Sequence, residues 1–185
     1  MSERVKTLLW TLVLIAGIGA SVLQLGDDQH HRPIGGHSHG HDHGSAHQPR
    51  KLFSWEPEQA HRLVLVSLEG TRLEFRREGD AWAAETTRGA AAAQAFDPQG
   101  YLNLFSQARS DREIPMDATV LESYGLKSPV LRVRVEDDAG QALAEVEVGQ
   151  RTPDGFGRYV FLPSAQTLHI VPNYQFSKAL EALGQ

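Results

Sequence analysis

The hydrophobic pattern divides the chain into three parts, and its longest apolar run lies near the start. Residues 7–26 form twenty consecutive positions without a charged side chain. A helix of this length, rising about 1.5 Å per residue, spans the roughly 30 Å hydrocarbon core of a bilayer. Arg4 and Lys6 precede the run, and Asp27 and Asp28 follow it. The positive-inside tendency therefore predicts a transmembrane helix with its N-terminus in the cytoplasm and the rest of the chain outside.

A cleaved secretory signal is the alternative interpretation of this run. The apolar core of a signal peptide is normally only about 7–15 residues long. The nearest approach to a small-x-small cleavage site is the segment 18–20, which is a poor match. The chain also contains no Cys that could carry a lipoprotein anchor. We therefore expect residues 1–26 to be an uncleaved anchor in the lipid bilayer.

Residues 27–51 differ in composition and predict a disordered linker. Apart from Ile34 the segment holds almost no apolar side chain, so it cannot bury enough surface to offset the entropy cost of ordering. Seven of the nine histidines of the chain lie here: His30, His31, His37, His39, His41, His43 and His47.

The core of this tract, GHSHGHDHG, indicates metal chemistry. Neutral imidazole is a ligand for zinc, copper and nickel, and the intervening Gly and Ser let several rings turn towards one ion. We therefore treat the seven histidines as candidate metal ligands for a labile zinc, copper or nickel ion, with no cofactor required. The alternative is a solvated spacer that gains positive charge as the pH falls through about 6.5.

Residues 52–185 carry the periodic patterns of a folded domain. Strands are predicted over 62–68, 71–77 and 81–87, separated by short turns that contain Gly. These short connections favour an antiparallel meander, in which Trp82 is the expected core anchor of the third strand.

Helix signals follow this first group of strands. Residues 89–95 have the composition of an Ala-rich connector. A helix then begins, with Asp97 as its N-cap and Pro98 at its first position. A second, short helix is expected over 118–124, and Gly125 ends it in the left-handed conformation.

The strand pattern then returns and leads to a last helix that opens at Asn173 after Pro172. Arginines and glutamates alternate on the outward side of the first hairpin in this group, so Arg132 and Arg134 are expected to pair with Glu145 and Glu147 across the strands. The predicted strands are 130–136, 143–148, 158–162 and 167–171, and the last of them carries His169 as an expected half-exposed residue.

This order of elements predicts the fold class. Three strands, then helices, then four strands and a helix indicate an α+β fold rather than alternating βαβ units. We therefore expect a mostly antiparallel sheet, or sheets, of about seven strands with two or three helices, preceded by one transmembrane helix.

Composition narrows the function classes. The 185 residues carry a net charge of −5, and residues 1–50 hold four basic and four acidic groups, so the acidic excess belongs to the domain. An acidic domain argues against nucleic-acid binding. The absence of Cys excludes thiol catalysis and Cys-ligated metal centres. No GxSxG elbow, Walker loop or HExxH motif occurs, so no catalytic residue and no small-molecule substrate is predicted.

A resemblance to a known family appears at residues 121–129, Leu-Glu-Ser-Tyr-Gly-Leu-Lys-Ser-Pro. Tyr124-Gly125-Leu126 with Pro129, a hairpin strand that ends at Gly149, and the later Gly157-Arg158-Tyr159 resemble the bacterial domain of unknown function 4340 over about residues 60–183. The resemblance implies a membrane-anchored protein encoded near parts of ABC-type transporters. It implies no catalytic residue, and the His-rich tract is not part of the family pattern.

We therefore expect a non-catalytic interaction module, anchored in the bacterial inner membrane, with its C-terminal domain in the periplasm. Its expected partners are the lipid bilayer and a membrane protein, as in an accessory subunit of an ABC-type exporter. The alternative is a periplasmic metal-handling protein that captures zinc, copper or nickel through the His-rich linker.

Overall fold

The computed structural model describes residues 49–85, 90–116 and 119–185. The predicted membrane anchor and nearly all of the predicted linker lie outside these residues. Within the described part of the chain, no helix is both long enough and apolar enough to cross a membrane.

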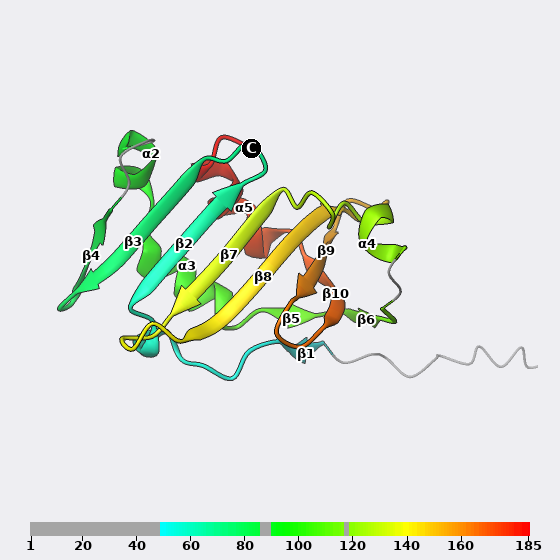
Figure 1. The fold of residues 1–185 in the computed structure, drawn as a ribbon, viewed down its shortest axis with the longest axis horizontal. Helices are drawn as coiled ribbons and strands as arrows, with labels where there is room; N and C mark the ends of the chain where they lie inside the picture. The colour runs from blue at the N-terminus through cyan, green and yellow to red at the C-terminus, as the bar shows by residue number, and fades with distance from the viewer. Residues whose placement is uncertain (1–48, 86–89, 117–118) are drawn as a thin grey trace, which may run out of the picture. The chain divides into compact units, whose positions relative to one another are not determined.

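An eight-stranded sheet forms the centre of the domain (Figure 1). Every strand pairing in it is antiparallel, in the order β4-β3-β2-β7-β8-β9-β10-β6. The strands are β2 (Arg62–Ser67), β3 (Arg72–Glu78), β4 (Ala81–Ala84), β6 (Arg112–Ile114), β7 (Leu131–Glu136), β8 (Ala142–Arg151), β9 (Gly157–Leu162) and β10 (Thr167–Pro172).

The sheet consists of two meanders joined side by side. The pairing of β2 with β7 joins them, with Val64 opposite Arg134 and Leu65 opposite Val133. Because side chains alternate along a strand, this register places the leucines of β2 and the valines of β7 on one face and the arginines on the other. The prediction of a mostly antiparallel α+β fold is confirmed.

Helices cover one face of this sheet. In Figure 1, α3 and α5 pass behind the strands, and no helix of the described residues lies in front of β3, β2, β7 and β8. The covered face packs Leu63, Leu73 and Val133 against helix residues such as Phe105 and Phe176. The helices are η1 (Pro57–Gln59, a 3-10 turn), α2 (Ala90–Ala95), α3 (Pro98–Phe105), α4 (Val120–Ser123) and α5 (Tyr174–Ala182).

The predicted starts of α3 and α5 are confirmed. The carboxylate of Asp97 accepts a hydrogen bond of 3.0 Å from the backbone N–H of Gly100, and Pro98 occupies the first turn of α3. Asn173 is the N-cap of α5. An Asp side chain that satisfies an otherwise free N–H explains why α3 begins where it does.

A second, smaller core lies where α4 meets the other end of the sheet. Leu126, Phe161 and Leu168 are buried there, and Tyr124 and Tyr159 pack against them. Phe161 lies opposite Glu147 in the register of β8 and β9, so this core forms on the face that the larger helices leave uncovered. The uncovered region is therefore restricted to β3, β2, β7 and part of β8.

Four details differ from the sequence prediction. The sheet has eight strands rather than about seven, because the short β6 extends it beyond β10. A two-stranded sheet also forms from β1 (Arg50–Lys51) and β5 (Arg109–Ser110). Residues 90–95 of the expected connector are helical, in keeping with the high helix propensity of Ala. Trp82 packs against the core but is only partly buried.

Candidate functional site

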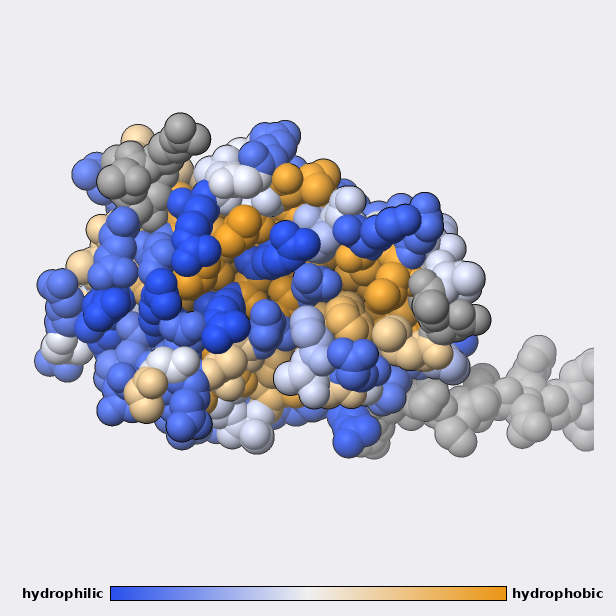
Figure 2. All heavy atoms as spheres, viewed as in Figure 1, coloured by the Kyte–Doolittle hydropathy of each residue, from blue (hydrophilic) through white to orange (hydrophobic). Residues whose placement is uncertain are grey.

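The uncovered face of the sheet carries a layer of paired charges, which we call the open face and define by Arg62, Arg72, Glu74, Arg76, Arg132, Arg134, Glu136, Glu145 and Glu147. Figure 2 shows this side of the molecule, with hydrophilic side chains in blue over an apolar area in orange. Val64 and Val66 of β2 face the same side, because they alternate with the core residues Leu63 and Leu65. The open face thus combines aliphatic side chains with guanidinium and carboxylate groups.

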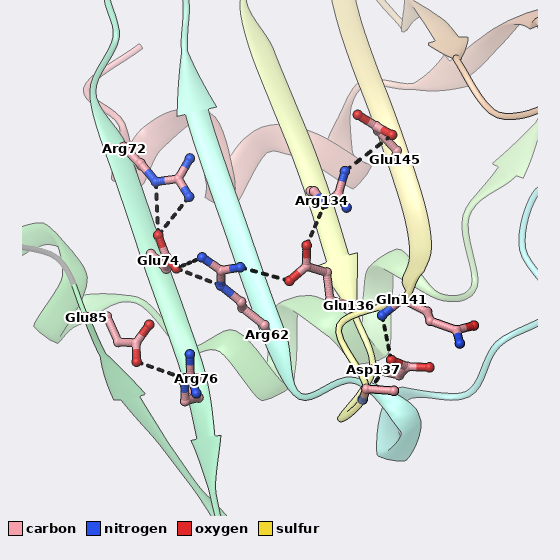
Figure 3. A network of polar contacts seen from close by, with 11 residues as sticks. Arg62, Arg72, Glu74, Arg76, Glu85, Arg134, Glu136, Asp137, Gln141 and Glu145 are labelled. Atoms are coloured by element: carbon pink, nitrogen blue, oxygen red, sulfur yellow. Dashed lines mark hydrogen bonds and ion pairs between the residues drawn. The ribbon is translucent and has the colours of Figure 1, made fainter.

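Arg62 is the centre of this layer (Figure 3). Its Nε donates to Glu74 Oε1 at 2.6 Å, and its second guanidinium nitrogen contacts the same oxygen. The remaining nitrogen donates to Glu136 Oε2 at 2.9 Å. Arg62 on β2 therefore links β3, which carries Glu74, to β7, which carries Glu136. Such forked, charge-assisted hydrogen bonds are stronger than neutral ones and fix the geometry of both partners.

The network continues outwards on both sides. Arg72 donates from Nε to Glu74 Oε2 at 3.0 Å, and Arg134 donates from Nε to Glu136 Oε1 at 2.6 Å. Arg134 also lies 3.6 Å from Glu145. Arg132 lies 3.1 Å from Glu147, so the predicted pairing between β7 and β8 is confirmed.

The charges of the network stabilise one another. Burial raises the pKa of the Glu74 carboxyl, but hydrogen bonds from Arg62 and Arg72 outweigh burial and leave that pKa below its ordinary value. The pKa of Glu136 is lowered in the same way, with burial opposed by hydrogen bonds from Arg134 and Arg62. Both carboxylates therefore remain ionised at neutral pH.

Guanidinium groups stand further into solvent than the carboxylates that they bind. The Arg72 side chain is 50% exposed and that of Glu74 only 15%. Arg134 is 43% exposed and Glu136 only 9%. A molecule that approached the open face would therefore meet arginine first, although the charges of the layer are largely compensated.

The seven predicted metal ligands, His30 to His47, lie outside the described residues. Among the described residues, no group of three or more His, Asp or Glu side chains could hold a metal ion. His61 precedes β2, where its Nδ1 lies 3.2 Å from the carbonyl oxygen of Gln59. His169 is buried, so the expectation of a half-exposed residue is wrong.

The burial of His169 results from a contact that is remote in sequence. Its Nδ1 lies 3.1 Å from Ser110 Oγ on β5, and its Nε2 lies 2.9 Å from Thr167 Oγ1. Ser110 donates its own hydroxyl hydrogen to the carbonyl of Arg112. That hydroxyl is buried, and the carbonyl of Arg112 accepts its hydrogen.

The family-like motifs of the sequence meet at one place in the fold. The rings of Tyr124 and Tyr159 stack with centroids 3.9 Å apart and an interplanar angle of 20°. The carbonyl of Tyr124 accepts a hydrogen bond of 3.0 Å from the N–H of Gln150, and Leu126 is buried beneath. Segments separated by up to 35 residues thus form a single packing unit of α4, β8 and β9.

Two glycines of these motifs are required, one by close approach and one by its backbone conformation. A Cβ at Gly149 would lie 2.2 Å from the carbonyl oxygen of Tyr124, which is closer than atoms can pack. Gly125 adopts a φ of +71°, as predicted for a helix C-terminus, and this conformation favours glycine. These two positions of the motifs are therefore set by packing and backbone conformation.

Comparison with family models shows to which protein family the chain belongs. Residues 86–183 match the model of a domain of unknown function, DUF4340. The chain belongs to the DUF4340 family. No curated protein and no solved structure gives a significant match.

The DUF4340 match covers the chain from just before α2 to the end of α5 and includes all the motif residues described above. It does not include β2, β3 and β4. The open face therefore combines β7 and β8 of the DUF4340 region with two strands that precede that region. The sequence analysis did not identify Arg62 as the centre of the charge network, because this role depends on the pairing of β2 with β7. These two strands lie about 70 residues apart in the chain. The local signals were the outward charges that alternate along β7 and the single Arg62 at the start of β2.

Proposed function

We propose that this chain is a membrane-anchored, non-catalytic periplasmic interaction module, an accessory subunit of a membrane complex such as an ABC-type exporter. The observation that carries the proposal is the open face. It offers a surface that no helix of the described residues covers, in which each guanidinium is held by a carboxylate. Ordered, partly exposed arginines beside aliphatic side chains are typical of protein interfaces.

Two further features support an interaction role. The strand β4, four residues long, forms one end of the eight-stranded order, so its outer edge is a candidate for pairing with an added strand. The apolar run of residues 7–26 supports the membrane anchor, and the charges that flank the run support an exported domain. The domain would then act close to the bilayer.

The test is copurification of the full chain, extracted from membranes in mild detergent. We expect a stable membrane protein partner to copurify with the wild type. Its recovery should fall at least severalfold when Arg72→Gln and Arg132→Gln are combined, since both arginines are half-exposed on the open face. The matched control is Lys127→Gln, an exposed cation beside α4 that pairs with Glu122. No specific partner, or equal loss in both variants, would reject this proposal.

Metal capture by the linker is a second candidate, favoured by the seven histidines within residues 30–47. Titration calorimetry of the full chain with zinc, copper and nickel should show binding at pH 7 that weakens at pH 5, because protonated imidazole is not a ligand. Serine at positions 37, 39, 41, 43 and 47 should abolish that binding, whereas His61→Ser should not. Unchanged affinity in the linker variant would exclude this function.

A further inference from the structure

Two large aromatic side chains stand exposed at the start of α5. Phe156, in the turn between β8 and β9, is 82% exposed, and Tyr174, the first residue of α5, is 60% exposed. The N–H of Asn173 donates to the carbonyl of Phe156 at 2.8 Å, so the turn and the helix start are joined. A phenylalanine left in water forgoes the favourable free energy of burying its apolar ring. Neighbouring exposed aromatics of this kind indicate an interface.

The turn that carries Phe156 is tightly hydrogen-bonded. Thr152 Oγ1 donates to Asp154 Oδ1 at 2.5 Å and accepts a hydrogen bond from the N–H of Gly157 at 2.9 Å. The N–H of Phe156 donates to Asp154 Oδ1 at 3.0 Å. These bonds fix the backbone on both sides of the ring. A side chain presented on a fixed backbone loses less entropy when it is bound.

A groove lies between α2 and α5, further along the same helix. Its volume is about 380 Å³, well above the roughly 150 Å³ of an apolar cavity that holds a benzene ring. Its apolar wall is built from alanines and one aromatic ring, with charged groups at its rim. The lining residues are Ala92, Ala95, Phe96, Asp97, Lys178, Glu181 and Ala182.

The exposed pair Phe156 and Tyr174, which we call the aromatic projection, is linked to the groove through α5. Tyr174 and Lys178 are four residues apart on α5 and so share one side of the helix. From Tyr174 to Ala182 the helix rises only about 12 Å. A two-fold interface pairs the same patch on both copies, so a patch that contains both a projection and a groove can be self-complementary.

We propose that the domain forms a two-fold dimer in which Phe156 of each copy enters the α2–α5 groove of the other copy. The charges beside Phe156 and at the groove favour a second copy of the chain as the occupant of the groove. Asp154, whose carboxylate accepts a hydrogen bond from the N–H of Phe156, lies beside the projection, and Lys178 lines the groove. Each inserted ring would therefore have a pair of opposite charges beside it. This inference is independent of the proposed partner complex, because it concerns only copies of this chain.

Cysteine cross-linking tests the dimer directly, because the natural chain contains no Cys. Full-length Asp154→Cys and Lys178→Cys proteins are purified separately in detergent, mixed and oxidised with diamide. We expect a disulfide-linked heterodimer. Adding Phe156→Ser to the Asp154→Cys protein should reduce its yield about tenfold. The matched control mixes Leu68→Cys, an exposed position on the β2–β3 turn, with Lys178→Cys, and should give no such product.

The outcomes separate the alternatives. The dimer proposal would be overturned if the yield of cross-linked product were no higher than in the Leu68→Cys control. It would also be overturned if Phe156→Ser left that yield unchanged. Loss of membrane-partner copurification in Phe156→Ser, without any cross-link in the mixture, would also overturn it in favour of a different protein in contact with Phe156. Thermal unfolding of Phe156→Ser serves as the folding check. Its midpoint should match that of the wild type, since the ring is mostly in solvent.

Discussion

At the scale of single residues, His169 is the clearest source of pH dependence in the described domain. Burial lowers the pKa of this imidazole below its ordinary value; Arg50 adds to the decrease and Glu113 opposes it. The unfolded chain therefore takes up a proton near pH 6.5, before the folded chain does. Because the folded state disfavours that proton, stability should be fully present above about pH 6.5 and decline as the pH falls through the folded pKa.

We predict that the free energy of unfolding decreases between pH 7.5 and 5.5, by at most about 1.4 kcal/mol per pH unit for one proton. Urea unfolding at several pH values measures this slope. His169→Gln should remove it, while His61→Gln should retain it. A slope that persists in His169→Gln would assign the pH dependence to the remaining histidines. Glu74 and Glu136 of the open face should not contribute in this window, because their pKa values lie below the ordinary value of 4.5.

A second residue-scale prediction concerns Tyr101, whose side chain is fully buried against Phe96 and Phe105. Its hydroxyl has no hydrogen-bond partner within the described chain. A buried polar group without a partner lowers stability, so Tyr101→Phe should raise the free energy of unfolding by about 1 kcal/mol. Chemical denaturation gives this value. Tyr124→Phe, at a partly exposed stacked ring, should change it little. A loss of stability in Tyr101→Phe would reveal a bound water or another hidden partner.

At the scale of elements, local sequence signals predicted the helix ends and strand faces that depend on contacts between residues close in the chain. Asp97, Pro98 and Gly125 mark the ends of helices through hydrogen bonds and backbone conformation within a few residues, and these boundaries are confirmed. The strand alternation placed Arg132 and Glu147 on one face, as found. The strands β5 and β6 were missed because they are only two and three residues long. Their pairing partners are remote, and such short segments carry no periodicity.

The contact between α4 and β8 gives the element-scale prediction. Gly149→Ala would place a methyl group against the carbonyl oxygen of Tyr124 and against Leu126, so the turn after α4 must move away from β8. We expect a loss of about 1–3 kcal/mol in stability. Gly70→Ala is the comparison, because its added Cβ meets no atom within 4 Å and only its positive φ is unfavourable. Thermal unfolding should show a larger decrease for Gly149→Ala. Equal decreases would mean that Tyr124 and Leu126 move away from the added methyl group at little cost, because Gly149 itself has no positive φ.

At the scale of the whole domain, the decisive junction is the pairing of β2 with β7. It joins the strands that precede the DUF4340 match to the strands within it. On the helix-covered face of the sheet this junction is apolar, with Leu63 opposite Val135 and Leu65 opposite Val133. On the open face, Arg62 donates hydrogen bonds to one glutamate from each meander. Neither glutamate could be assigned to Arg62 from sequence, because the pairing of the meanders is a property of the complete fold.

Replacing Arg62 should therefore destabilise the junction in a pH-dependent way. In Arg62→Gln, Glu74 and Glu136 keep Arg72 and Arg134 but lose the cation that lies between them. We expect a loss of about 1–2 kcal/mol at pH 7, a modest value because Arg62 is one-third exposed and partly screened by solvent. The wild-type carboxylates have lowered pKa values, so Arg62 stabilises the fold above about pH 4.5, and that contribution is lost as the pH falls through the folded pKa. The difference between variant and wild type should thus shrink towards pH 3.

Denaturant unfolding of both proteins at pH 7 and pH 3.5 measures this change. Arg132→Gln is the matched control, because it removes one pair at the side of the open face and leaves the junction intact. It should cost less than about 1 kcal/mol at pH 7, as expected for an exposed ion pair. If Arg62→Gln costs no more than Arg132→Gln, then the apolar contacts beneath the sheet alone hold the two meanders together. In that case the arginines of the open face would be free to serve a partner rather than the fold.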